Sequence, residues 1–367
     1  MILKKAEGGK TMPRAYLVLA DGTVYEGEGF GADCEAVGEL VFTTGMEGYL
    51  ETLTDPSYAG QIVMQTFPLI GNYGVIEADF EGACCARGYV VREWCDTPSN
   101  FRCQGALDAF LKSRGVPGLC GVDTRAITRR IRERGVINAM ICREVPADLD
   151  ALRQYAVRGV VAQVSCVQPA IYPAADKALY RVALLDYGAK RNIVRELQKR
   201  GCEVTVLPAN TPAETVLKMH PDGLMLSNGP GDPEENTFCI VQIAALLGKL
   251  PLFGICLGHQ MTALAAGGRT EKMKYGHRGA NQPVKEVGGA RCYITSQNHG
   301  YAVVSDSVRE GRISYLNAND GSCEGIDYPE LNAFTVQFHP EASAGPHDTA
   351  FLFDRFISMM RGECACR

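Results

Sequence analysis

The chain has 367 residues, 46% of them hydrophobic and 22% charged, which is typical of a globular protein with room for two domains. Its net charge of -5 and the lack of a long basic run argue against a nucleic-acid partner. No apolar run reaches the ~20 residues that a membrane span needs, and the first residues do not form a secretory signal, so we expect a cytoplasmic protein with reduced thiols and no membrane partner.

The first part of the chain is rich in short apolar runs that glycine and proline interrupt. An Asp-Gly pair at residues 21–22 separates two such runs, as in a β-hairpin, and strand-like runs follow at 38–45 and 60–68. Residues 101–115 and 123–135 have helical spacing, and the second of these segments begins with an aspartate and ends on a basic turn. These patterns predict a mixed β/α domain over residues 1–150.

The rest of the chain has a different pattern. Residues 151–179 contain polar and proline-rich sequence, and we interpret them as a connecting segment. From residue 180 to residue 361, strand-like runs alternate with helix-like runs, and a short tail at 362–367 follows. The alternation predicts an α/β domain with a mostly parallel sheet that helices cover on both faces. Sites in such sheets collect at the carboxyl ends of the strands.

A cysteine lies at one of these strand ends. In Gly-Ile-Cys-Leu-Gly, residues 254–258, Cys256 stands between an apolar run and a helix-like run, as the nucleophile does in an α/β nucleophile elbow. Gly254 and Gly258 leave room for the strand and the helix to approach each other. The helix beginning near Leu257 would favour the thiolate, and the Leu257 N–H would face an oxyanion. The alternative is a buried structural cysteine.

A nucleophilic thiol needs a base, and the base needs a group that orients it. His339 ends a strand-like run and Glu341 follows two positions later, so both side chains face the same side of an extended segment. None of the other five histidines combines a strand end with a carboxylate at this spacing. In residues 226–233, Gly229 and Gly231 flank a proline and form a loop suited to a second oxyanion donor. The predicted constellation is Cys-His-Glu.

No pattern indicates a metal or a cofactor in this chain. No cysteine or histidine pair has the spacing of zinc ligands. The Gly-Gly-Lys-Thr sequence at 8–11 lacks the earlier glycine of a P-loop. The Gly-Glu-Gly-Phe-Gly-Ala sequence at 27–32 precedes no long helix, so we interpret it as a hairpin turn and not as a dinucleotide site.

Taken together, the motifs resemble those of a known family. Ser-Asn-Gly-Pro-Gly-Asp-Pro, Gly-Ile-Cys-Leu-Gly-His-Gln and His-Pro-Glu resemble the motifs of class I (triad) glutamine amidotransferases. The first part of the chain, with Gly-Glu-Leu-Val-Phe-Thr-Thr-Gly and Gly-Val-Asp-Thr-Arg-Ala-Ile-Thr-Arg-Arg, resembles the N-terminal domain of the carbamoyl-phosphate synthetase small subunit. The likeness runs from about residue 14 to about residue 360.

The resemblance implies a reaction and a set of substrate contacts. Cys256 would attack the side-chain amide of glutamine, releasing ammonia and leaving a γ-glutamyl thioester, while His339 would carry the protons and Glu341 would orient it. Gly45 stands where many members have a serine, and Tyr301 where phenylalanine is common. The implied glutamine contacts are Gly45, Gly229, Gly231, Leu257, Gln260, Asn298, Gly300 and Tyr301.

The resemblance also implies a partner and leaves alternatives. Ammonia would pass to a separate large subunit that uses ATP, with Mg, and bicarbonate to make carbamoyl phosphate for pyrimidine and arginine biosynthesis. The alternatives are the glutaminase component of another synthase (anthranilate or GMP type), a non-catalytic regulatory subunit, and a cysteine peptidase of related fold. The first 145 or so residues argue against a bare glutaminase, and the complete triad argues against a non-catalytic subunit.

Overall fold

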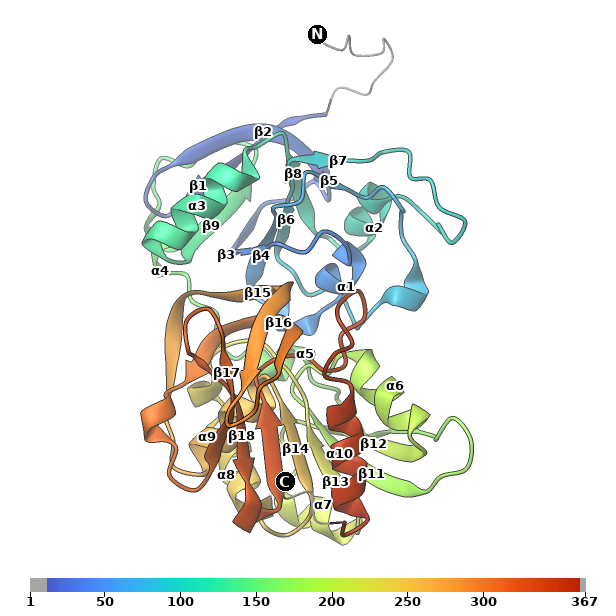
Figure 1. The fold of residues 1–367 in the computed structure, drawn as a ribbon. Coiled ribbons are helices and arrows are strands. Elements are labelled where there is room, and N and C mark those ends of the chain that lie inside the picture. Colours follow the sequence, from blue (N-terminus) through green and yellow to red (C-terminus); the bar gives the residue numbers. More distant parts are fainter. Residues whose placement is uncertain (1–11, 364–367) are drawn as a thin grey trace.

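The computed structural model describes residues 12–363 and places them in two stacked parts (Figure 1). The upper part in Figure 1 is a β-barrel with helices beside it, and the lower part is a sheet between helices. Residues 1–11 and 364–367, which include the P-loop-like sequence and most of the expected tail, lie outside the described residues.

The barrel closes with the strand order β1-β2-β8-β6-β4-β3-β9. The hairpin expected around residues 21–22 is present, because β1 and β2 pair antiparallel on either side of that turn. Both faces of the strands are buried. Leu40 and Ile62 pack in one cluster with α3 (Thr124–Arg134). Val41 and Val63 pack in another with α1 (Tyr49–Leu53) and α2 (Leu107–Ser113). The strands are β1 (Arg14–Leu19), β2 (Val24–Gly31), β3 (Ala36–Thr43), β4 (Gln61–Gln65), β6 (Gly88–Val90), β8 (Pro117–Cys120) and β9 (Ile137–Cys142).

Short helices and a small ribbon complete this part. The helix predicted at 123–135 is α3 (Thr124–Arg134), where the Asp123 carboxylate accepts a hydrogen bond from the Ala126 N–H and so caps the first turn. The helix predicted at 101–115 is limited to α2 (Leu107–Ser113). The remaining elements are α1 (Tyr49–Leu53), the 3₁₀ turns η1 (Pro56–Tyr58) and η2 (Glu77–Asp79), and the paired strands β5 (Leu69–Ile70) and β7 (Glu93–Trp94).

The connection between the two parts is partly ordered into elements. It contains the short helices α4 (Asp150–Gln154) and α5 (Val161–Val164). It also contains β10 (Ala170–Tyr172), which pairs antiparallel with β12 and forms one edge of the second sheet. The connecting segment therefore contributes a strand to the second part of the protein.

The second part is built on a ten-stranded sheet, ordered β10-β12-β11-β13-β14-β19-β18-β17-β15-β16. Strands β12, β11, β13, β14 and β19 run parallel, as the alternating pattern predicts. The other strands are antiparallel. Their bounds are β11 (Tyr180–Asp186), β12 (Cys202–Pro208), β13 (Gly223–Leu226), β14 (Leu252–Ile255), β15 (Thr270–Glu286), β16 (Cys292–Val303), β17 (Arg312–Asn317), β18 (Cys323–Tyr328) and β19 (Ala333–Val336).

The α/β fold is thus confirmed, but the sheet is mixed, whereas the sequence analysis expected it to be mostly parallel. A parallel pair needs a long crossover, usually a helix. Between residues 270 and 336 the described chain contains no α-helix, and the strands there pair antiparallel: β15 with β16 and β17, β17 with β18, and β18 with β19. The long pair β15 and β16 reaches toward the barrel in Figure 1.

Helices cover both faces of the parallel strands. Alternate residues of β11 point to opposite faces: Ala183 and Leu185 pack in the cluster with α7, α8 and α9, whereas Val182 and Leu184 pack in the cluster with α6 and α10. This alternation explains why β11 is apolar along its length. The helices are α6 (Arg191–Lys199), α7 (Ala213–Lys218), α8 (Thr237–Leu246), α9 (Leu257–Ala265) and α10 (Phe351–Met360).

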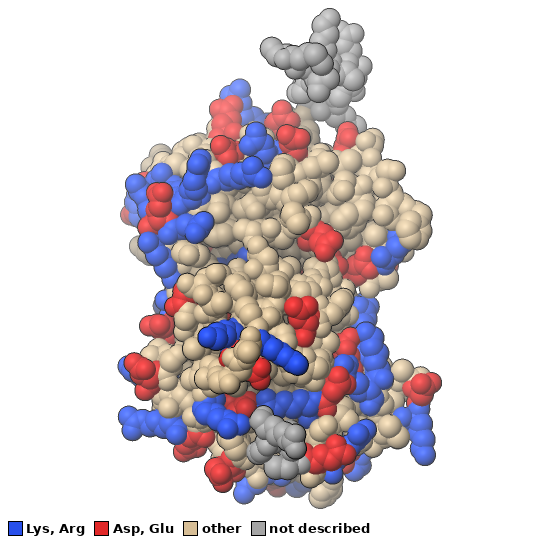
Figure 2. Space-filling model, viewed as in Figure 1, with Lys and Arg blue, Asp and Glu red and all other residues tan. Residues whose placement is uncertain are grey.

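Charges of both signs are spread over the face seen in Figure 2. Basic residues gather near the upper left, over the arginine-rich helix α3 (Figure 2). This charge is partly neutralised, because Arg130 forms an ion pair with Asp21 at 2.5 Å and Arg134 approaches the same carboxylate at 3.6 Å. Within residues 12–363, every helix is too short or too polar to cross a bilayer.

Cysteines in the described residues are unpaired, and several are buried. Cys323 is fully buried in the core, and burial raises the pKa of its thiol to about 12. In the unfolded chain the same thiol ionises near pH ~8.5. Above that pH the unfolded state loses a proton that the folded state keeps, so stability falls as pH rises toward 12 and is unaffected by this group at neutral pH.

We therefore expect Cys323→Ala to flatten the alkaline loss of stability. Urea unfolding between pH 8 and pH 10.5 should give a slope that is smaller in the variant by about 1.4 kcal/mol per pH unit above pH ~9. The substitution lowers stability at pH 7 through the small cavity that it leaves, so the slopes are compared, not the absolute values. Parallel curves for the two proteins would contradict the assignment of a buried, protonated thiol.

Candidate active site

Cys256 is the single residue between β14 and α9. Its φ of 53° and ψ of -102° are strained for a residue with a side chain, and its N–H donates to the Val336 carbonyl at 2.8 Å. A Cβ on Gly258 would lie 2.6 Å from the Leu226 carbonyl oxygen, so glycine is what lets α9 approach β13 this closely. The turn has the geometry expected of a nucleophile elbow.

The Cys256 thiol is only 2% exposed, and Sγ donates a hydrogen bond to the Asn298 carbonyl at 3.7 Å. Burial raises the pKa of this thiol to about 12, although Lys190 and the Leu257 N–H act in the opposite direction. The Leu257 N–H at the start of α9 thus favours the thiolate as expected, but desolvation of the charged form outweighs it and the pKa of the thiol rises. At neutral pH the thiol needs a base.

His339 and Glu341 form the expected pair just beyond β19. Nδ1 of His339 lies 2.7 Å from Oε1 of Glu341, and both side chains are buried. Because a carboxylate only accepts, Nδ1 carries the proton and Nε2 is left as a base. Nε2 has no hydrogen-bond partner among the described residues, and Sγ of Cys256 is bonded to Asn298 instead. Proton transfer therefore requires the thiol to turn from the Asn298 carbonyl to His339.

Two charged residues that sequence reasoning missed complete this cluster. The buried Lys190 ammonium lies 3.7 Å from Oε1 of Glu341 and 3.4 Å from Oδ2 of Asp55, which belongs to the barrel. Asp55 Oδ2 also accepts a hydrogen bond from the Asn298 side chain at 2.9 Å. Burial alone would raise the pKa of Glu341, but His339 and Lys190 hold it below its usual value. Glu341 is therefore ionised and can orient an imidazolium.

Asn228 ties the barrel to the loop that follows β13. Its Nδ2 donates to Ser57 Oγ at 2.9 Å and to the Gly188 carbonyl at 3.0 Å, while its Oδ1 accepts from the Lys190 N–H at 3.0 Å. All these bonds are buried. The barrel thus helps to position Lys190 through both Asp55 and Asn228.

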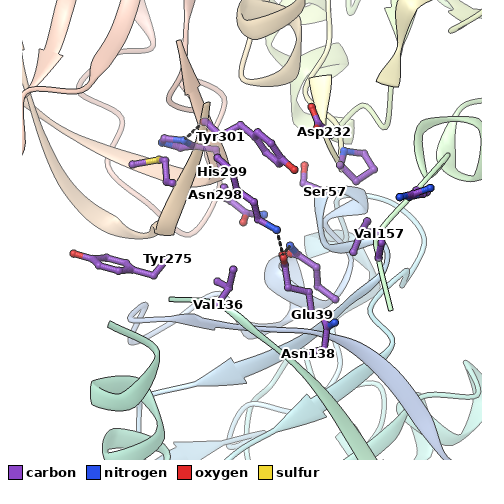
Figure 3. Close-up of a pocket in the computed structure, with 18 of the residues that line it drawn as sticks. Glu39, Ser57, Val136, Asn138, Val157, Asp232, Tyr275, Asn298, His299 and Tyr301 are labelled. Atoms are coloured by element: carbon purple, nitrogen blue, oxygen red, sulfur yellow. Dashed lines mark hydrogen bonds and ion pairs between the residues drawn. The ribbon is translucent and has the colours of Figure 1, made fainter. Parts of the chain in front are cut away.

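A cavity of about 560 Å³ opens beside Cys256, between the barrel and the sheet. Figure 3 shows Asn298 and Tyr301 on one side, Ser57 from the barrel and Asp232 from the loop after β13. The cavity is large enough for a small amino acid. Of the residues predicted from sequence, its wall contains Gly229, Gly231, Cys256, Gln260, Asn298, Gly300 and Tyr301.

Two predicted contacts lie elsewhere. Leu257 is buried and directs its N–H toward the Cys256 sulfur. Gly45 lines a separate cavity of about 60 Å³, on the other side of Asn298, with Asp55 and Lys190. The structure therefore does not bring Gly45 to the wall that holds Cys256, and the serine on that wall is Ser57.

The predicted polar contacts hold one another in place. Gln260 Nε2 donates to the Tyr301 carbonyl at 2.8 Å and to Gln337 Oε1 at 2.9 Å. A Cβ on Gly229 would lie 2.3 Å from the Tyr187 carbonyl oxygen, so this loop position accepts only glycine. The Gln260 side chain is therefore held in place before any substrate binds.

A second buried polar cluster lies behind β16 and was not predicted. His277 Nε2 lies 2.9 Å from Asp320, and its Nδ1 lies 3.3 Å from Glu324, which also accepts from Gln297 and Asn317. His299 approaches Glu324 at 4.0 Å, so these three side chains have the types and spacing of metal ligands. The hydrogen bonds within the cluster account for their polar atoms without an ion.

Lys190 follows the carboxyl end of β11, so the rule that sites collect at the carboxyl ends of parallel strands could have found it. Asp55 and Ser57, in contrast, come from the other part of the chain. No pattern within the second part shows which barrel residues will face it. Sequence reasoning about one domain therefore misses the residues that a neighbouring domain supplies.

Both parts of the chain match models of known protein families. Residues 17–141 match the family model "Carbamoyl-phosphate synthase small chain, CPSase domain", and residues 183–359 match "Glutamine amidotransferase class-I". A carbamoyl phosphate synthase small chain from Fusobacterium nucleatum is 51% identical over 348 residues, 93% of this chain and 96% of the relative. Proteins of the same name from Bacillus thuringiensis and Listeria monocytogenes are each 50% identical, over 94% and 96% of this chain and 95% and 98% of the relatives.

These matches span the barrel and the sheet together, at an identity that shared fold alone does not produce. The chain belongs to the family of carbamoyl phosphate synthase small chains.

Proposed function

We propose that this chain hydrolyses the side-chain amide of glutamine to glutamate and ammonia. The observation that carries the proposal is the strained Cys256 turn, which opens to a cavity and whose buried thiol interacts electrostatically with Glu341, the partner of His339. A strained residue at a strand end, beside an oriented imidazole, is the arrangement that nucleophilic catalysis needs.

The proposed reaction has two halves. In the first, His339 Nε2 takes the thiol proton as Cys256 Sγ attacks the amide carbon, and the same proton leaves on ammonia when the C–N bond breaks. In the second, His339 takes a proton from water, which attacks the γ-glutamyl thioester and releases glutamate and the thiol. The Leu257 N–H, which faces the sulfur, and the N–H groups of Gly229 and Gly231 would stabilise the oxyanion of each step.

The glutamine contacts are a further part of the proposal. Gly229, Gly231, Gln260, Asn298, Gly300 and Tyr301 line the cavity beside the thiol and would surround the substrate. Ser57 lies on the same wall and would supply a hydroxyl there, whereas Gly45, at the position where many members have a serine, offers none.

The family adds a partner. We propose that the ammonia passes to a carbamoyl phosphate synthase large chain, which would bind ATP, Mg and bicarbonate and serve pyrimidine and arginine biosynthesis. The match of residues 17–141 to the small-chain model favours this partner over an anthranilate or GMP synthase. A cytoplasmic location agrees with the free thiols of the described cysteines.

The proposal is tested by measuring glutamate and ammonia release with and without a large chain. We expect slow hydrolysis by the isolated chain and an increase of at least about tenfold with the large chain, ATP and bicarbonate, because the thiol must leave the Asn298 carbonyl to meet His339. No glutamine hydrolysis in either condition would refute the function. If the isolated chain hydrolysed glutamine as fast as the complex does, the proposed coupling to the large chain would be refuted, but glutamine hydrolysis itself would not.

A further inference from the structure

The cavity beside Cys256 contains a buried cation without a counterion. Arg278 on β15 is 5% exposed and lies on the cavity wall. Its side chain makes a single hydrogen bond within residues 12–363, from Nη1 to the Tyr275 carbonyl at 2.5 Å. Nε is buried without a partner, and no described carboxylate lies within ion-pair distance of the guanidinium.

Such an arrangement costs free energy, since a buried charge is normally paired. Lys190, the other buried cation of this region, has both Asp55 and Glu341. Glu39 is near Arg278 but is already held by Lys272 at 2.5 Å. Burial lowers the pKa of Arg278, as expected of a desolvated and unpaired guanidinium. A group retained at this cost is typical of a binding site that an anion completes.

The surrounding backbone is shaped to hold the guanidinium. Arg278 pairs directly with Asn298 across β15 and β16, so the two side chains stand on the same face of the sheet. A Cβ on Gly276 would lie 2.6 Å from Nη1 of Arg278, and a Cβ on Gly300 would lie 3.2 Å from Nη2. Glycine at both positions leaves the space that the guanidinium occupies beside Asn298.

We propose that Arg278 binds the α-carboxylate of glutamine while the γ-amide reaches Cys256. The inference rests on the proposed function and identifies one specificity-determining contact of the same site. A planar guanidinium with free N–H groups matches a carboxylate in shape and charge. Free glutamine carries an α-carboxylate that the γ-amide chemistry does not use, so a buried cation beside the thiol selects the free amino acid over other primary amides.

The test compares two substrates in the complex with the large chain. L-glutamine has the α-carboxylate, and 4-aminobutanamide is the same molecule without it. For Arg278→Met we expect kcat/KM for L-glutamine to fall about 10- to 100-fold, mainly through KM, and kcat/KM for 4-aminobutanamide to change less than about threefold. The ratio of kcat/KM for L-glutamine to kcat/KM for 4-aminobutanamide should therefore be lower in Arg278→Met than in the wild type by about the same factor.

Arg158→Gln is the matched control, because Arg158 is an exposed arginine at the same cavity and should leave the preference unchanged. An unchanged preference in Arg278→Met would overturn the proposal. So would an equal loss for both substrates, since that result would place Arg278 at the thiol. A wild type that hydrolyses neither amide would instead refute the proposed function itself.

A second variant covers the case in which Arg278→Met does not fold. Arg278→Lys keeps the positive charge but loses the planar guanidinium that can bind a carboxylate through two N–H groups. It should therefore keep part of the preference for L-glutamine, with a KM between those of the wild type and Arg278→Met. Calorimetric binding of L-glutamine to Cys256→Ser should likewise weaken about 10- to 100-fold when Arg278→Met is added, and by a smaller factor when Arg278→Lys is added. Unchanged affinity in the double variants would contradict the carboxylate contact.

Discussion

Cys256→Ser should lose glutamine hydrolysis by about 10³-fold or more while the protein stays folded and still binds the large chain. The hydroxyl is a weaker nucleophile than the thiol, and its ionisation in this buried position is even less favourable than that of a thiol whose pKa is already about 12. In the proposed mechanism the substitution removes the group that would make the covalent bond, so the loss should appear in kcat. It is measured as glutamate release in the complex, with circular dichroism and co-purification as checks on folding and assembly.

Cys202→Ser is the control for this variant. Cys202 is also fully buried, lies in the same hydrophobic cluster, and burial likewise raises the pKa of its thiol to about 12. Its replacement should lower stability slightly and leave hydrolysis intact. Equal losses in the two variants, or substantial turnover in Cys256→Ser, would exclude Cys256 as the nucleophile.

Gly258→Ala should destabilise the protein by about 3 kcal/mol, the upper part of the range for overpacked sites. Helix propensity alone predicts a gain of about 1 kcal/mol for this change within α9. The added Cβ would lie 2.6 Å from the Leu226 carbonyl oxygen and 2.8 Å from its Cβ, and both groups belong to a buried strand that cannot move aside. Overpacking therefore outweighs helix propensity, and the net change is a loss of stability. We also expect α9 to shift away from β13 to relieve the contact, which should reduce hydrolysis.

Gly105→Ala is the matched control, because a Cβ at Gly105 would meet nothing within 4 Å. Urea unfolding of both variants and of the wild type gives the comparison. A stability equal to or above that of the wild type in Gly258→Ala would show that α9 does not press against β13 as described.

Local patterns predicted the local parts of this protein. The Asp-Gly hairpin, the Asp123-capped helix α3, and the Cys256 turn each depend on a few neighbouring residues, and the structure contains all three. The pairing of His339 with Glu341 depends on a spacing of two in an extended segment, which also needs no distant information. These features were readable because short-range sterics and hydrogen bonding determine them.

The predictions that the structure corrected concern features that depend on contacts between distant segments. Whether burial or a helix end governs the Cys256 thiol depends on the whole surrounding core, and burial outweighed α9. Gly45 and Ser57 are twelve positions apart on the same stretch of the barrel, and only the docking of the barrel places Ser57 on the wall of the large cavity. Strand pairing after residue 270 likewise followed from the lack of helical crossovers there.

The covalent role of Cys256 is tested most directly by trapping. A glutamine analogue with a chloromethyl ketone in place of the γ-amide should alkylate one thiol per chain, and peptide mass spectrometry should locate the adduct on Cys256. Labelling should run in parallel with the loss of hydrolysis, and L-glutamine should slow both. Complete inactivation with Cys256 unmodified, or with the label on another cysteine, would contradict the account.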